Sequence, residues 1–204
     1  MSKIKKISTM TLLMIPVGVA INFVAMNLIQ PILQVVLGDS IGTILVGSIC
    51  GPVAGGLVGL LSNVVNIVKS PIMVLYSINS ILFGVIAGLL AKKGWAKSFP
   101  KTIISSVIYA VIGGGIGSFI TYTLLGGEMG GNMANAVIGT PMVMAGAPVL
   151  LATEVGGIIF DLIDKIVVVI IVYLLIRALP NRFLAKLPMA DYVMSKNKND
   201  DNED

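Results

Sequence analysis

The sequence predicts an all-α integral membrane protein with six transmembrane helices, cytoplasmic N and C termini, a short second helix and an external cavity. The first observation is composition: 56% of the 204 residues are hydrophobic and only 12% are charged, whereas a soluble domain carries about 25% charged residues. The second is a series of long uncharged runs separated by short polar segments, because a bilayer-crossing helix needs about 20 apolar residues.

The third observation is where the basic residues lie. Twelve of the 14 Lys and Arg residues fall within the segments 3–6, 92–101 and 177–198, and the other two are Lys69 and Lys165. Basic residues mark the cytoplasmic loops of membrane proteins, so the three segments are predicted to lie inside. The sequence pI near 9.2 is then mainly a topology signal, with lipid-headgroup contact as a second role and no nucleic-acid partner.

The expected spans follow from this pattern. A stretch of 29 uncharged residues separates Asp39 from Lys69, which is too long for one span and too short for two. Gly51 and Pro52 lie near its centre, where proline disfavours helix in the residue before it. We therefore expect a tight hairpin whose short first arm leaves room for the external cavity. The six spans are predicted at 7–29, 39–50, 53–68, 72–91, 102–125 and 160–179.

Two segments are expected to differ from these spans. Residues 126–160 read as an external Gly-rich loop followed by a short re-entrant or cavity-lining helix, because Pro148 interrupts the apolar stretch. The membrane substrate-binding domain is predicted to cover 1–180. Residues 181–204 form a polar cytoplasmic tail that we expect to be disordered.

The residues present exclude several kinds of chemistry. The chain has no histidine and one cysteine, and it contains neither a Walker lysine loop nor a nucleophile elbow. We expect no metal, no cofactor and no enzymatic activity in this chain, so any ATP hydrolysis belongs to partner subunits.

Polar side chains instead mark the predicted outer ends of several spans. Converging polar groups within apolar walls are typical of a small-molecule site, although an intramembrane polar group also bonds to neighbouring helices. Asp161 and Lys165 either neutralise each other or serve a ligand, and the adjacent Asp164 and Lys165 are not expected to face one another. The predicted substrate-binding residues are Asp39, Tyr76, Asn79, Tyr122, Glu154, Asp161, Asp164 and Lys165.

Three stretches resemble a known family. DSIGTILVGSICGPVAGGLVGLLSN (39–63), DLIDKIVVVIIVYLLIRALPNR (161–182) and IPVGVAINFV (15–24) are similar to the substrate-binding S components of energy-coupling factor (ECF) transporters. The resemblance implies a multi-pass subunit of a prokaryotic plasma membrane that binds a vitamin or related micronutrient outside. It further implies partnership with a membrane T component and two cytoplasmic ATPases, and toppling of the subunit in the bilayer to release its cargo inward.

The partner-docking residues depart from the family pattern. Such proteins often carry an Ala-x-x-x-Ala face on the first helix, whereas Ala20 and Ala25 are five residues apart here. The docking surface is therefore expected to combine small residues of the first and third spans, namely Gly18, Ala20, Ala25, Gly51, Gly55 and Gly59.

Two other functions stay open from the sequence alone. A stand-alone secondary transporter or channel would use Asp39 and Glu154 as ion-coupling carboxylates. A ligand-binding membrane sensor or scaffold would hold a soluble partner on the basic loop 92–101. The substrate itself is equally open among a flavin, a pyridoxine-like ring, a queuosine precursor and other vitamins.

Overall fold

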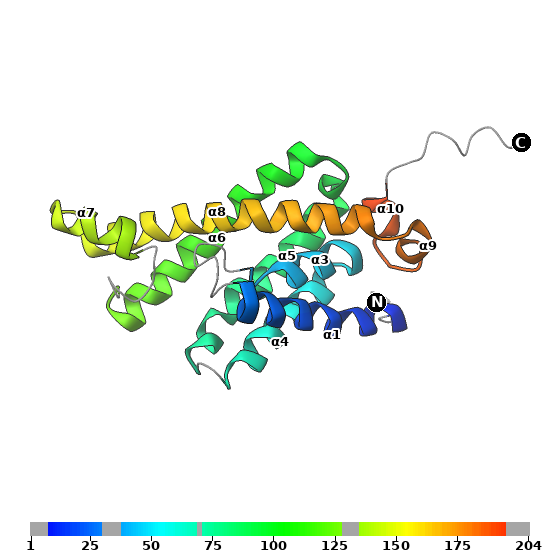
Figure 1. Cartoon of the computed structure of the whole chain (residues 1–204), viewed down its shortest axis with the longest axis horizontal. Coiled ribbons are helices and arrows are strands. Elements are labelled where there is room, and N and C mark those ends of the chain that lie inside the picture. The colour runs from blue at the N-terminus through cyan, green and yellow to red at the C-terminus, as the bar shows by residue number, and fades with distance from the viewer. Residues whose placement is uncertain (1–7, 30–37, 69–70, 128–134, 195–204) are drawn as a thin grey trace, which may run out of the picture.

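A computed structural model describes residues 8–29, 38–68, 71–127 and 135–194, and these residues form helices without any strand (Figure 1). The segment between the first two predicted spans lies outside the described residues except for Gly38. The longer helices, in chain order, are α1 (Thr9–Val24), α3 (Ile41–Cys50), α4 (Pro52–Asn66), α5 (Ser77–Lys92), α6 (Phe99–Leu125) and α8 (Val149–Ala178). The shorter ones are η1 (Ala25–Ile29), η2 (Pro71–Tyr76), η3 (Trp95–Lys97), η4 (Asn135–Gly139), α7 (Thr140–Met144), α9 (Asn181–Leu184) and α10 (Ala190–Val193).

The prediction of an all-α protein is confirmed, and three helical stretches are long and apolar enough to cross a membrane. These are Thr9–Leu28, Pro71–Lys92 and Phe99–Leu125. Two further apolar helices, α3 and α4, are shorter than a bilayer-crossing helix. The chain is therefore compatible with a membrane protein by the length and composition of its helices.

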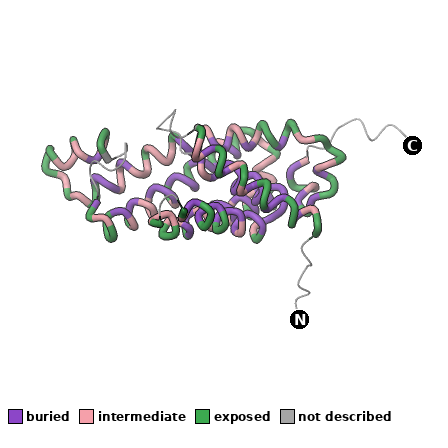
Figure 2. The backbone as a smooth tube through the Cα atoms, turned by 60° about the horizontal axis from the view of Figure 1, so that its bottom comes forward, coloured by how far each residue is buried: buried purple, intermediate pink, exposed green. Residues whose placement is uncertain are grey.

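Helix α3 forms the centre of the bundle. All ten of its residues are buried, and α1, α4, α5 and α8 pack around it. Figure 2 shows the buried residues gathered toward the middle of the molecule. A helix that is largely apolar on every side is suited to such a central position. The predicted hairpin turn is confirmed, because Gly51, at φ 103°, separates the end of α3 from Pro52 at the start of α4.

Glycines allow the helices of this bundle to approach closely. A Cβ atom on Gly84 of α5 would collide with the backbone of Gly55 on α4, and one on Gly42 of α3 would collide with the backbone of Gly18 on α1. Close backbone approach at small residues is how membrane helices pack without a hydrophobic driving force between them.

This packing corrects most of the predicted docking surface. Gly18, Gly55 and Gly59 face neighbouring helices inside the bundle, Ala25 is buried, and Gly51 is buried beside the Met189 side chain. The isolated chain therefore buries five of the six predicted docking residues. Ala20 alone of the predicted set is exposed.

The segment 126–160 also differs from its prediction. Helix α8 begins at Val149 and continues for 30 residues to Ala178. Residues 149–160 therefore belong to the last long helix and do not form a separate re-entrant one. Pro148 lies immediately before the first turn, where its missing N–H removes no helical hydrogen bond. The proline therefore starts the helix instead of interrupting it. Helices α6 and α8 pack against each other, and at the end where α7 lies both extend beyond α1, α3, α4 and α5 (Figure 1).

The C-terminal segment is ordered further than predicted. Residues 181–194 include α9 and α10, and they bury Leu184, Leu187, Met189 and Val193. The Met189 N–H donates to the carbonyl of Ile49 at 3.3 Å, next to the turn between α3 and α4. Apolar side chains spaced among the charged ones therefore hold this part of the tail against the bundle. Residues 195–204 lie outside the described part.

The described basic segments gather at one end of the molecule. The Arg177 guanidinium donates to the carbonyl of Lys97 at 2.8 Å, and α10 packs against η3 and α5. The start of α1 lies at the same end as α9 and α10 (Figure 1). Lys97 and Arg177, which are 80 residues apart in the sequence, are thus neighbours in space.

Candidate functional site

A buried ion cluster joins α8 to the start of α3. Lys165 is 1% exposed, and its Nζ lies 2.5 Å from Asp164 Oδ2, 3.5 Å from Asp39 Oδ1 and 3.8 Å from Asp161 Oδ1. The same Nζ lies 4.7 Å from the centre of the Phe83 ring on α5. Three carboxylates and one aromatic face therefore surround a single ammonium group.

The contact between Asp164 and Lys165 contradicts the prediction that these neighbours do not face each other. Their Cβ atoms diverge on the helix, but the lysine stem is long enough to fold back to the preceding carboxylate. Both side chains are 1% exposed, and a buried charge is strongly unfavourable without a partner. Burial therefore forces the pairing that the sequence spacing alone disfavours.

The backbone before α3 completes the coordination of Asp164. The N–H of Gly38, at φ 63°, donates to Asp164 Oδ1 at 3.1 Å. Both oxygens of this carboxylate are thus engaged, one by Gly38 and one by Lys165. Asp164 is consequently a positioning residue that fixes α8 against the start of α3, whereas Asp39, with its side chain 33% exposed, keeps an accessible edge.

Asn79 lies beside the cluster, at the interface of α5 and α6. Its side-chain nitrogen donates to the carbonyl of Gly113 at 3.2 Å. Because that carbonyl can only accept, the amide oxygen of Asn79 must point away from it. A Cβ atom on Gly113 would collide with Asp161 Oδ2, so the absence of a side chain at Gly113 lets Asp161 and Asn79 approach the same turn of α6.

Tyr76 continues this polar row along α6. Thr121 donates its hydroxyl proton to the carbonyl of Gly117 at 2.9 Å, so the Tyr76 hydroxyl is the donor in its own 2.9 Å contact with Thr121 Oγ1. Gly113, Gly117 and Thr121 recur every four residues and share one face of the helix. The predicted residues Tyr76, Asn79 and Asp161 therefore follow one face of α6.

Two predicted site residues lie apart from the cluster. Tyr122 is 36% exposed, one residue further around α6 than Thr121. Glu154 precedes Asp161 by seven residues on α8, about 10 Å along the helix axis. The structure thus brings together Asp39, Asp161, Asp164 and Lys165, places Asn79 and Tyr76 along the adjoining row, and leaves Tyr122 and Glu154 outside both.

The asparagines of α1 and α4 have structural partners. Asn22 of α1 donates to Thr43 Oγ1 at 2.7 Å and to Ser62 Oγ at 2.9 Å, and its oxygen accepts from the N–H of Gly42. Asn63 donates to Ser80 Oγ at 2.7 Å. These bonds link α1, α3, α4 and α5, which is the alternative role that intramembrane asparagine offers.

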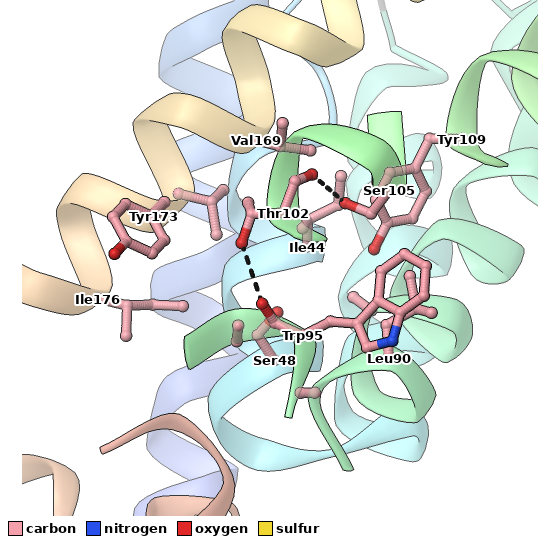
Figure 3. A pocket seen from close by; sticks show the side chains of 14 residues that line it. Ile44, Ser48, Leu90, Trp95, Thr102, Ser105, Tyr109, Val169, Tyr173 and Ile176 are labelled. Atoms are coloured by element: carbon pink, nitrogen blue, oxygen red, sulfur yellow. Dashed lines mark hydrogen bonds between the residues drawn. The ribbon is translucent and has the colours of Figure 1, made fainter. Parts of the chain in front are cut away.

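A small cavity lies near the basic end of the bundle, away from the ion cluster. Figure 3 shows Trp95, Tyr109 and Tyr173 around it, together with Ser48 of α3 and Ile176 of α8. Its volume is about 30 Å³, which is enough for a water molecule and far below the few hundred Å³ of a ligand pocket. The sequence did not predict this cavity, since residues from five elements form it.

The function has to be inferred from the geometry of the chain, because the comparisons with known proteins give no match. No protein-family model, curated protein or solved structure matches this chain. Among the residues described here, no group of His, Cys, Asp and Glu side chains is arranged to hold a metal ion. What the fold and the cluster define is an all-helical protein with membrane-length apolar helices and a buried, acid-rich polar site.

Proposed function

We propose that this chain is the substrate-capture S component of an ECF-type importer in a prokaryotic plasma membrane. It would bind a vitamin or related micronutrient on the external side and deliver it inward together with a membrane T component and two ATPase subunits. The observation that carries the proposal is the contact of Asp39 with Lys165 at 3.5 Å across 126 positions of sequence. These residues belong to the two longest stretches that resemble the family, and the fold joins them in one cluster.

Burial of the cluster supports a functional role. Ionisable residues among membrane helices are costly and are by default associated with ligands, ions or protons. The side chains of Lys165 and Asp164 lie deep in the bundle, whereas the Asp39 side chain is partly exposed. A carboxylate at the edge of a buried charge cluster is suited to receiving a ligand from one side.

Charge distribution supports the direction of transport. The basic segments around Lys97, Arg177 and Arg182 adjoin one another at one end of the bundle, and basic residues favour the cytoplasmic side. Asp39 lies just before the first residue of α3, at the end of that helix away from the contact between Ile49 and Met189, and Lys165 lies near the middle of α8. In this orientation, which is that of the six-span topology, the acidic cluster faces outward and the cavity beside Trp95 faces the cytoplasm.

Co-purification and uptake together test this function. The tagged chain is expressed in its native host, and the proteins retained in mild detergent are identified by mass spectrometry. Recovery of a T component and two ATPases, with uptake that stops when an ATPase Walker lysine is replaced, is the expected result. Uptake by the isolated chain in liposomes would instead establish a stand-alone transporter. Recovery of a soluble partner without uptake would establish a sensor or scaffold.

A further inference from the structure

The ion cluster contains more acid than base. Asp164 and Lys165 form the short pair, at 2.5 Å, and Gly38 occupies the second oxygen of Asp164. The carboxyl oxygens of Asp39 and Asp161 lie farther from the same Lys165 Nζ, at 3.5 Å and 3.8 Å. Carboxylates in a low-dielectric interior are stable only beside sufficient positive charge. The cluster therefore contains three carboxyl groups and a single ammonium group.

Two buried acceptor atoms next to this cluster accept no hydrogen bond from a side chain within the described residues. They are Asp161 Oδ2 and Asn79 Oδ1. Asn79 is only 7% exposed, and its amide nitrogen is already committed to the carbonyl of Gly113. A buried acceptor atom without a hydrogen-bond donor is unfavourable, so these two oxygens are available to accept hydrogen bonds from a ligand.

Lys165 is not positioned to receive an anion. Its Nζ is enclosed by Asp39, Asp161 and Asp164, and the Phe83 ring covers a further side. An anionic ligand would therefore meet carboxylates before it met the ammonium group. A ligand with acceptors alone would leave both buried acceptor atoms as they are.

We propose that the ligand of this site is an organic cation with at least two N–H donors, such as an amidinium or a protonated amino-heterocycle. One N–H donates to Asp161 Oδ2 and another to Asn79 Oδ1, while the positive charge offsets the excess of carboxylates at Asp39 and Asp161. Lys165 stays paired with Asp164. The inference rests on the proposed function, and it narrows the substrate of that importer to nitrogen-rich cationic compounds.

Three compounds with one shared ring test the charge requirement. Benzamidine, benzamide and benzoate carry an amidinium, a neutral amide and a carboxylate on the same benzene ring. Binding to the full-length protein in nanodiscs is measured by calorimetry in potassium phosphate, because Tris is itself an organic cation. Benzamidine is expected to bind about tenfold or more tightly than benzamide, since charge-assisted hydrogen bonds are stronger than neutral ones, and benzoate is expected not to bind.

Variants locate the binding. Asp161→Asn is expected to weaken benzamidine binding about tenfold or more, whereas Asp191→Asn, an acidic position on α10 outside the cluster, leaves it unchanged. Asp39→Asn serves the same purpose at a partly exposed position if Asp161→Asn does not fold. Absence of benzamidine binding, equal binding of benzamide, preference for benzoate, or displacement of benzamidine by Mg²⁺ at equal concentration would each overturn the proposal. So would unchanged affinity in the Asp161 and Asp39 variants.

The outcome separates this inference from the proposed function. If the T component and ATPases co-purify but benzamidine does not bind, the chain is an importer subunit for another substrate class. If benzamidine binds through Asp161 and no such partners are recovered, the cation site stands and the importer assignment fails.

Discussion

The backbone N–H of Gly38 donates to Asp164 Oδ1 at 3.1 Å and so ties the start of α3 to α8. The other oxygen of the same carboxylate lies 2.5 Å from Lys165 Nζ, deep in the bundle. One side chain thus holds two helices together and neutralises a buried charge. Asp164 is more important to the architecture of the cluster than to direct contact with a ligand.

Removing Asp164 is expected to destabilise the protein strongly. Asp164→Ala leaves the buried Lys165 without its closest partner and the Gly38 N–H without an acceptor, and breaking a buried ion pair costs about 3–5 kcal/mol. The double variant Asp164→Ala, Lys165→Met removes the orphaned charge and should recover a substantial part of that loss. Unfolding in detergent with increasing denaturant measures both. A single variant within about 1 kcal/mol of the parent would contradict this structural role.

The close approach of α4 and α5 gives a second prediction. A Cβ atom on Gly84 would meet the backbone of Gly55, whereas one on Gly115 of α6 would meet only Glu154 Oε2, at 3.9 Å. Gly84→Ala is therefore expected to cost about 1–3 kcal/mol, because backbone cannot move aside as a flexible side chain can. Gly115→Ala, its matched control, should be neutral or stabilise by up to about 1 kcal/mol. Thermal unfolding of the two variants in the same detergent compares them, and equal melting temperatures would refute the packing argument.

The sequence predicted where the helices lie along the chain better than it predicted which elements pack against one another. Uncharged runs and the Gly51–Pro52 turn located α3, α4 and α5, because membrane helices leave a strong signal in length and polarity. Helix α8 was divided wrongly because Pro148 stops a helix in its interior but is harmless at its start. The ordered part of the tail was missed because Leu187 and Met189 are scattered among charged residues, and only tertiary contact shows their burial.

The candidate site could be predicted only in part for a related reason. Polar residues within apolar runs identified Asp39, Asp161 and Lys165, since charge inside a bundle is rare. The contribution of Gly113 depends on the backbone of α6 meeting Asn79 and Asp161, which no spacing within one helix reveals. The glycines at 55 and 59 gave the opposite error, because small residues indicate close packing without indicating whether the partner is in the same chain.

Contact of the tail with the α3–α4 turn gives a third prediction. Leu187 is buried, and the neighbouring Met189 N–H donates to Ile49. Leu187→Ala should weaken this local docking by at least about 1.4 kcal/mol, so trypsin should cleave at Arg182 and Lys186 about tenfold faster through local opening. Tyr192→Ala, at an exposed position of α10, is the control. Equal cleavage rates in both variants would show that the tail is not held by this contact.

Ala20 gives the last prediction, which rests on the proposed importer function. Within the described residues of the predicted docking set, Ala20 is the exposed one, and it lies on an exposed stripe of α1 with Leu13, Val17 and Val24. These positions recur at helical spacing, so they form one outward face.

Ala20→Trp adds a large side chain to that face and is expected to reduce recovery of the T component about tenfold by steric overlap. The melting temperature of the isolated chain should not change, because Ala20 has no role in the interior. Leu89→Trp, at an exposed position of α5, controls for added bulk on an apolar surface. Loss of the T component in the Leu89 variant, or full recovery in the Ala20 variant, would place the docking surface elsewhere.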